Sequence, residues 1–78
     1  MKIEKNKKVI GKKQTQRALL KNEADSVYIA KDADKRVVNE IIIISEDNNI
    51  NIIYVETMDK LGKMFGIDVK AAVAATLK

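Results

Sequence analysis

Residues 34–47 read DKRVVNEIIIISED, and the fold class depends on whether they form a strand or a helix. The run Ile41–Ile44 consists of four β-branched residues, which favour a strand by propensity. Length favours a helix, because thirteen residues separate Asp34, a candidate N-cap, from the turn at residues 48–49. The apolar side chains also recur at helical spacing, namely Val37, Val38, Ile41, Ile42 and Ile44. We therefore predict a mostly buried helix over residues 35–47.

Patterns on both sides of this helix predict alternating strands and helices. Residues 26–30 are apolar almost throughout, as in a strand covered on both faces, and residues 51–55 form another strand. We predict further strands at residues 8–10 and from Ala72 onward. Helices are expected over residues 13–20 and between the N-cap Thr57 and a left-handed Gly66, the second with an apolar stripe of Met58, Leu61, Met64 and Phe65. The alternation predicts an α/β layer sandwich with a largely central sheet.

Composition limits the chemistry that the chain can perform. Its 78 residues are enough for one domain, and we assign residues 8–78 to it, after a flexible basic N-terminus of residues 1–7. The absence of Cys and His removes disulfides, thiolate nucleophiles, imidazole bases and the usual zinc ligands together. Asp32 and Asp34 could be a carboxylate pair, although helix-capping residues would give the same pattern. We expect no enzyme, no cofactor and no metal site.

The chain also carries no sign of a membrane or secretory destination. No apolar run approaches the roughly 18–20 residues that span a bilayer. The charged start, residues 1–8, is not followed by the apolar core of a signal peptide. We therefore expect a cytoplasmic protein without membrane contact.

Charge is distributed unevenly along the chain. Residues 1–22 have eight basic side chains and one acidic one, whereas residues 23–78 have seven basic and ten acidic ones. A basic end on a mildly acidic body favours a polyanionic partner that is met by one face. A solubilising tail would give the same asymmetry, and charge alone leaves both interpretations open.

The segment GKKQTQR, residues 11–17, is the candidate recognition motif. If a helix starts near Lys13, then Lys13, Gln14 and Arg17 cluster on its exposed first turn. A helix N-terminus offers N–H groups and positive dipole charge to phosphate. Gln14 can donate and accept at a base edge, and Arg17 can donate a fork to guanine N7 and O6. Gly11 would allow the backbone to approach the ligand closely.

Three ordered blocks resemble a known family. Gly11–Thr15 with Arg17-Ala18-Leu19 resembles the helix signature of the kink-turn-binding ribosomal protein superfamily, the group of the archaeal large-subunit ribosomal protein seven-Ae. Residues 27–34, VYIAKDAD, resemble that family's strand and Ala-x-Asp-x-Asp loop, and Val55–Val69 resembles its Lys-x-Leu-Gly and Gly-Ile-Glu-Val block. The match covers about residues 8–77, and the small bacterial YbxF-like type is most similar.

The resemblance implies a three-layer α-β-α sandwich with a mixed four-stranded sheet, and binding of kink-turn RNA. In the family, an Asn-Glu pair and a Lys one turn later read sheared G·A pairs, and the apolar loop contacts bulged nucleotides. These positions correspond to Lys13, Gln14, Arg17, Ile67, Asp68 and Val69 here. With Gly11, Lys12 and Lys31 they make up the RNA-binding residues that we expect. The sequence departs from the family at Lys13 and Gln14, which replace Asn and Glu, and at Lys35, which replaces a Pro.

The leading hypothesis is therefore a monomeric, ribosome-associated protein that binds kink-turn RNA, either ribosomal or regulatory. The alternative is a protein–protein adaptor on the same fold without RNA specificity, since a fold does not determine a function. The basic segment of residues 1–22 argues against the adaptor.

Overall fold

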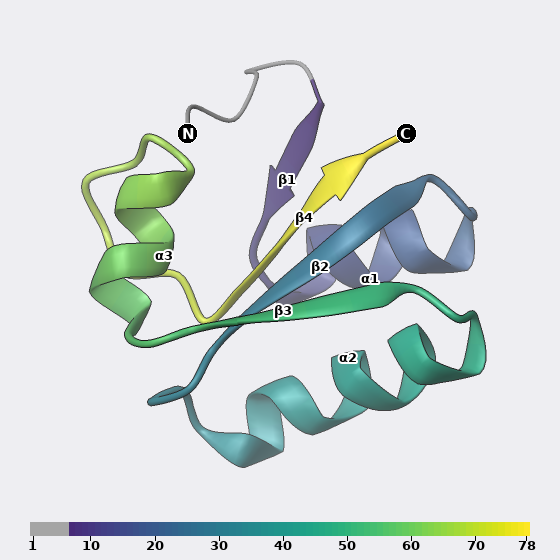
Figure 1. The fold of residues 1–78 in the computed structure, drawn as a ribbon, viewed down its shortest axis with the longest axis horizontal. Coiled ribbons are helices and arrows are strands. Elements are labelled where there is room, and N and C mark those ends of the chain that lie inside the picture. The colour runs from purple at the N-terminus through teal and green to yellow at the C-terminus, as the bar shows by residue number, and fades with distance from the viewer. Residues whose placement is uncertain (1–6) are drawn as a thin grey trace.

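Four strands form one mixed sheet in the computed structural model, which describes residues 7–78 (Figure 1). The strands are β1 (Lys8–Ile10), β2 (Ala24–Ala30), β3 (Asn51–Val55) and β4 (Val73–Leu77). The helices are α1 (Lys12–Leu20), α2 (Lys35–Asp47) and α3 (Met58–Met64). The strand order is β1-β4-β2-β3, in which β4 runs antiparallel to both neighbours and β3 runs parallel to β2.

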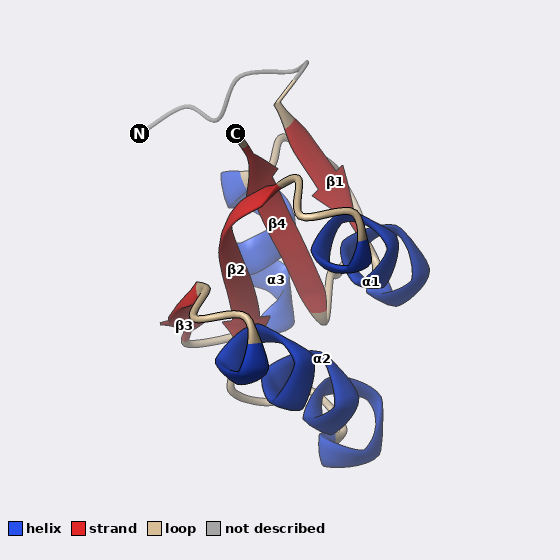
Figure 2. Ribbon diagram, turned by 90° about the vertical axis from the view of Figure 1, so that its right-hand side faces the viewer, coloured by secondary structure: helices blue, strands red, loops and turns tan. Residues whose placement is uncertain are grey.

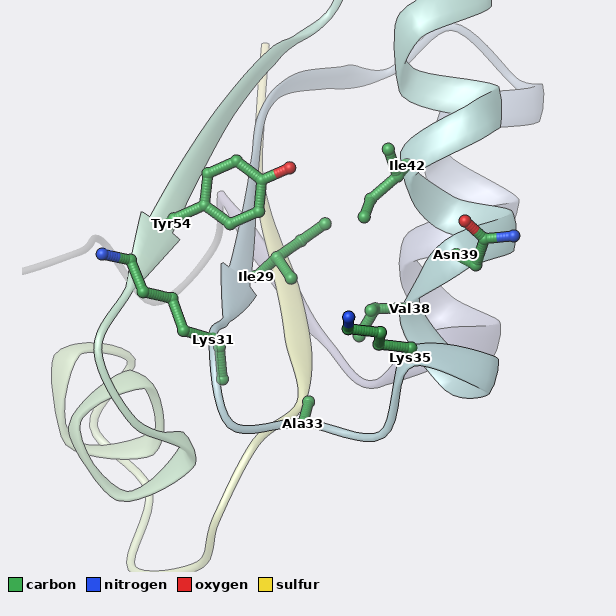
Figure 3. A pocket seen from close by; sticks show the side chains of 9 residues that line it. Ile29, Lys31, Ala33, Lys35, Val38, Asn39, Ile42 and Tyr54 are labelled. Atoms are coloured by element: carbon green, nitrogen blue, oxygen red, sulfur yellow. The ribbon is translucent and has the colours of Figure 1, made fainter.

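Helices lie on both faces of this sheet. The ring of Tyr28 on β2 meets the ring of Phe65, the C-cap residue of α3, edge to face with centroids 5.2 Å apart. The next residue, Ile29, points to the opposite face and lies beside Val38 of α2 (Figure 3). Figure 2 shows α1 and α2 together on that second face. The α/β class and the three-layer sandwich with a mixed four-stranded sheet are therefore confirmed.

The central position of β2 explains its composition. It pairs with β4 on one side and β3 on the other, and Val27, Tyr28, Ile29 and Ala30 are all buried. Small residues of β4 such as Ala74 and Ala75 are fully buried between the two helical layers. A continuous apolar run is the expected pattern of a strand that is covered on both faces.

The ambiguous segment is a helix, as predicted. The Asp34 side chain accepts a hydrogen bond from the backbone N–H of Arg36 and so caps α2. The Thr57 side chain caps α3 in the same manner, through the N–H of Lys60, and Gly66 adopts the expected left-handed conformation with φ of 76°. The capping residues, more than the β-branched run, therefore determine where these helices begin.

Two details of burial differ from the predictions. Helix α2 buries only one face, with Val38, Ile41 and Ser45 inside and Ile43 50% exposed. Met64 is 38% exposed and does not belong to the buried stripe of α3. Six residues turn a helix by about 600°, so Met64 points roughly 120° away from Met58, whereas Leu61 and Phe65 return to the same side.

The chain ends are partly described. The N–H of Leu77 donates to the carbonyl of Lys7 over 2.8 Å, which continues the pairing of β1 with β4 by one residue. The rest of the stretch predicted to be flexible, residues 1–6, lies outside the described residues. Within residues 7–78 no helix has the length and apolar character needed to cross a membrane.

Candidate nucleic-acid interface

The sequence blocks that suggested RNA binding converge at one end of the sheet. The N–H of Gly11, between β1 and α1, donates to the carbonyl of Val73 over 2.9 Å. The N–H of Ala30, at the end of β2, donates to the carbonyl of Ala72 over 3.0 Å. The loop that follows α3 runs to this end before it enters β4 (Figure 1). The start of α1, the end of this loop and the end of β2 therefore lie at the same end of the sheet.

Helix α1 presents a basic, polar turn to solvent. It begins at Lys12, one residue before the predicted start, after Gly11 with φ of 100°. Gly11 has no side chain to cap the helix, and no acidic residue lies in the first turn. Thr15, Ala18 and Leu19 are buried, while Lys13, Gln14 and Arg17 are exposed. The predicted recognition turn thus has free positive dipole charge and two full positive charges at one place.

Two of the N-terminal lysines make contacts within the protein. The Nζ of Lys12 lies 3.4 Å from Oε2 of Glu40 on α2, and Nε2 of Gln16 donates to the other oxygen of that carboxylate over 3.0 Å. The Nζ of Lys8 donates to the carbonyl of Phe65, at the end of α3, where a cation is favourable. An RNA phosphate would have to compete with Glu40 for Lys12.

The loop that carries Ile67, Asp68 and Val69 is fastened to α3. The N–H of Ile67 donates to the carbonyl of Gly62 over 3.0 Å, and the N–H of Ala71 donates to the carbonyl of Met58 over 3.2 Å. Ile67 is half-buried, Asp68 is exposed, and Val69 is 68% exposed. The backbone is thus held while an aliphatic side chain faces solvent, which suits an apolar contact with an unstacked base.

Lys31 lies in a different surrounding from the α1 turn. Its backbone N–H donates to the carbonyl of Val55 over 2.8 Å, directly after β2. Its side chain lines a cavity of about 270 Å³ between β3 and α2, together with Tyr54, Lys35 and Ile42 (Figure 3). The structure therefore brings Lys31 to the same end of the sheet but groups it with β3 and α2.

The two aspartates of the 32–34 segment hold helix ends. Oδ1 of Asp32 accepts from the N–H of Met58 over 2.8 Å, and Asp34 caps α2. The hydrogen bond from the Arg36 side chain lowers the pKa of the Asp34 carboxyl below its ordinary value. The capping interpretation therefore accounts for both carboxylates. In the described part of the chain, no three His, Cys, Asp or Glu side chains are placed to hold a metal ion.

One polar atom in α1 has no partner. The Oγ1 of Thr15 is fully buried and makes no hydrogen bond. Neither this atom nor the contact of Gln16 with Glu40 was predicted. Thr15 could have been recognised as buried, because it shares a helix face with Ala18 and Leu19, but the partner of Gln16 depends on how α1 packs against α2.

Comparison with known proteins places these features in context. A family model described as "Ribosomal protein L7Ae/L30e/S12e/Gadd45 family" matches residues 1–78. The chain is 51% identical over 69 residues to an RNA-binding protein of Caldanaerobacter subterraneus subsp. tengcongensis, covering 88% of this chain and 84% of the relative. It is 40% identical over 76 residues to the RNA-binding protein YbxF of Geobacillus stearothermophilus, covering 97% and 93%.

A solved structure shares the fold. The 15.5 kD RNA binding protein of Giardia lamblia superposes with a TM-score of 0.87 at 23% sequence identity, over 94% of this chain. The chain spans 62% of the length of that protein. At this level of identity the likeness establishes the architecture alone.

Proposed function

Because the chain belongs to the ribosomal protein L7Ae/L30e/S12e/Gadd45 family, we propose that it binds structured RNA that contains a kink-turn or a similar motif. The relatives from Caldanaerobacter subterraneus and Geobacillus stearothermophilus are RNA-binding proteins by name, in agreement with the prediction that the chain is not an enzyme. The observation that supports the proposal is the exposed, basic turn of Lys13, Gln14 and Arg17 at the start of α1. Gly11, directly before this turn, is hydrogen-bonded to Val73, where the segment that carries Ile67–Val69 enters β4.

The turn on α1 supplies attraction and base readout. In this proposal Arg17 donates to guanine N7 and O6, while Lys13 contacts phosphate, helped by the dipole of α1. Gln14 uses its acceptor oxygen and donor amide at the edge of a base pair. Sheared G·A pairs widen the groove that this turn enters, in accord with the family resemblance. Gly11 contributes by allowing the RNA backbone close to the start of the helix, since a Cβ there would meet no protein atom within 4 Å.

The loop supplies contact with nucleotides that leave the stack. Val69 offers exposed aliphatic surface, and Ile67 supports it from a half-buried position. Asp68 accepts hydrogen bonds from base or sugar donors, and its negative charge disfavours a phosphate group at the same place. Lys12 at the start of α1 and Lys31 after β2 attract the RNA phosphates at long range, which steers the RNA without reading its sequence.

The physiological setting follows as part of the same proposal. We propose a cytoplasmic protein that acts as a monomer on ribosomal or regulatory RNA, without a cofactor. Crosslinking the protein to RNA in cells and sequencing the attached fragments tests this. Reads without kink-turn elements would contradict the proposed target class.

A gel-shift titration tests the central claim. A kink-turn RNA should bind tightly, and the same RNA with its G·A pairs changed to Watson–Crick pairs should bind weakly and with strong salt dependence. The Arg17→Ala variant should lose about 1–3 kcal/mol of binding free energy on the kink-turn. Arg36→Ala, at the other arginine of the chain, is the matched control and should bind as the unaltered protein does. Equal affinity for both RNAs would refute specific recognition.

A further inference from the structure

The outer edge of β3 is not covered by another strand of residues 7–78, because the sheet ends there. The carbonyl of Val55 accepts the N–H of Lys31 and therefore faces β2. Backbone groups of neighbouring residues in a strand point to opposite sides, so the N–H and C=O groups of Ile52 and Tyr54 face outward. A row of unpaired backbone groups at a sheet edge can pair with another extended chain.

An apolar cavity lies next to this edge. It has a volume of about 270 Å³ and opens between the ring of Tyr54 on β3 and helix α2 (Figure 3). Ile29, Val38 and Ile42 line it with aliphatic surface, and the Tyr54 side chain is 51% exposed. The cavity is large enough for one branched or aromatic side chain, and its polar lining is limited to Lys31, Lys35, Asn39 and the Tyr54 hydroxyl.

Positive charge is concentrated at one end of the edge. Lys31 and Lys35 both line the cavity. The ion pairs among residues 7–78 are Lys12–Glu40, Arg36–Asp34 and Lys60–Glu56, so neither cavity lysine has a direct ion pair in that part of the chain. Glu56 is paired with Lys60, which is the main cause of its lowered pKa, and Lys31 acts on it only through space. The edge therefore combines unpaired backbone, an apolar cavity and two cations without a direct ion pair.

We propose that the outer edge of β3 and this cavity form a docking site for an extended segment of a partner protein. The segment adds as a strand beside β3, inserts one apolar side chain beside Tyr54, and carries acidic side chains opposite Lys31 and Lys35. Strand addition gains its affinity from main-chain hydrogen bonds and its specificity from pockets for alternate side chains. This goes beyond RNA binding, since β3 and β1 are opposite edges of the sheet and α1 starts directly after β1. Lys31 is the residue that the docking site shares with the proposed RNA-binding set.

The same features disfavour two other occupants. The outward N–H and C=O groups of Ile52 and Tyr54 alternate as a peptide backbone requires, whereas a nucleic acid has no repeating amide to match them. A second copy of this chain would present its own β3, Asn51–Val55, which contains no carboxylate to meet the lysines. An acidic, apolar peptide satisfies the backbone, the cavity and the charges together.

A synthetic peptide tests the proposal with the full-length protein. The probe is an acetylated hexapeptide with one central phenylalanine and with glutamates two residues before and two residues after it, so that all three side chains lie on the same face of the added strand. Its titration is followed by amide NMR, and shifts are expected at Ile52, Tyr54 and Lys31. Replacing the glutamates of the peptide with lysines should weaken binding roughly tenfold or more, as should the double variant Lys31→Glu and Lys35→Glu. The double variant Lys21→Glu and Lys63→Glu, an equal change of charge at exposed residues outside the cavity, should leave binding unchanged.

Peptides methylated on the backbone nitrogen distinguish strand pairing from non-specific association. Methylation on the residues that face β3 should abolish binding, and methylation on the alternate residues should preserve it. Equal binding of both methylated peptides, or shifts confined to α1 and the Ile67–Val69 loop, would overturn the proposal. Concentration-dependent shifts at Ile52 and Tyr54 without peptide would assign the edge to a second copy, and the same shifts with kink-turn RNA would assign it to RNA.

Discussion

The carbonyl oxygen of Val69 rests against Gly62, so closely that a Cβ on Gly62 would lie 2.1 Å from it. The N–H of Ile67 completes the contact by donating to the carbonyl of Gly62 over 3.0 Å. Gly62, within the seven-residue helix α3, is thus the residue against which the loop that we assign to RNA contact packs. Glycine is required there because of this close approach, and the position costs some helix propensity.

The Gly62→Ala substitution should therefore displace the loop. A methyl group at residue 62 would overlap the backbone oxygen of Val69, so either the loop or α3 must move. We expect a loss of about 1–3 kcal/mol in unfolding free energy, as for other overpacked positions, together with weaker binding to kink-turn RNA. Urea unfolding and a gel shift measure the two effects. Lys63→Ala, at the next and exposed residue, is the control and should change the unfolding free energy little. An unchanged loop position in Gly62→Ala would contradict the close packing of Val69 on Gly62.

The Val69→Ser substitution separates binding from stability. The side chain of Val69 is 68% exposed, so its replacement should alter the unfolding free energy by less than about 0.5 kcal/mol. If the side chain packs on an unstacked base, RNA affinity should fall by an amount on the order of 1 kcal/mol. Ile43→Ser, at a half-exposed aliphatic residue on α2, is the control that should bind RNA normally. Normal RNA affinity for Val69→Ser would remove this residue from the interface.

The carboxylate of Glu40 should restrain RNA binding. It lies within 3.4 Å of Lys12 Nζ and accepts a hydrogen bond from Gln16, beside the start of α1. The Glu40→Gln substitution removes a negative charge and leaves Lys12 available to phosphate, so affinity should rise on the order of 2- to 5-fold, the range of an exposed ion pair. The slope of log affinity against log salt should become steeper, by up to about one.

Two further variants make this measurement decisive. Lys12→Ala should weaken binding similarly for all RNA sequences and flatten the salt slope, and in that background Glu40→Gln should bring a smaller gain. Glu46→Gln, also exposed and near the other end of α2, controls for net charge. A gain of equal size from Glu46→Gln would show that only overall charge matters.

The contrast between Asp34 and Glu40 explains how far the sequence could predict this protein. Asp34 acts on the N–H of Arg36, two residues away, so its role was visible in the local pattern. The same holds for Thr57 and for the left-handed Gly66. Glu40 meets Gln16 across 24 residues, and that contact exists only because α1 and α2 pack together. Likewise, Gly62 was part of a family motif in the sequence, but only the fold shows that the backbone of Val69 packs closely against it.

Asp34 also makes the stability of the fold depend on pH. Hydrogen bonds from the side chain and the backbone of Arg36 lower the pKa of its carboxyl, because they favour the ionised form in the folded state. A depressed folded pKa adds stability at pH values above the unfolded pKa, and this contribution is lost as pH falls through the folded pKa.

The Asp34→Asn variant keeps a capping oxygen but cannot ionise. Its melting temperature should therefore be lower than that of the unaltered protein at neutral pH, and the gap should close in acid. Circular dichroism melts from neutral pH down to the acid limit of folding measure this difference. Asp34→Ala, which loses the cap as well, should remain less stable than Asp34→Asn at every pH. A gap between the unaltered protein and Asp34→Asn that stays constant into acid would contradict an ionised cap.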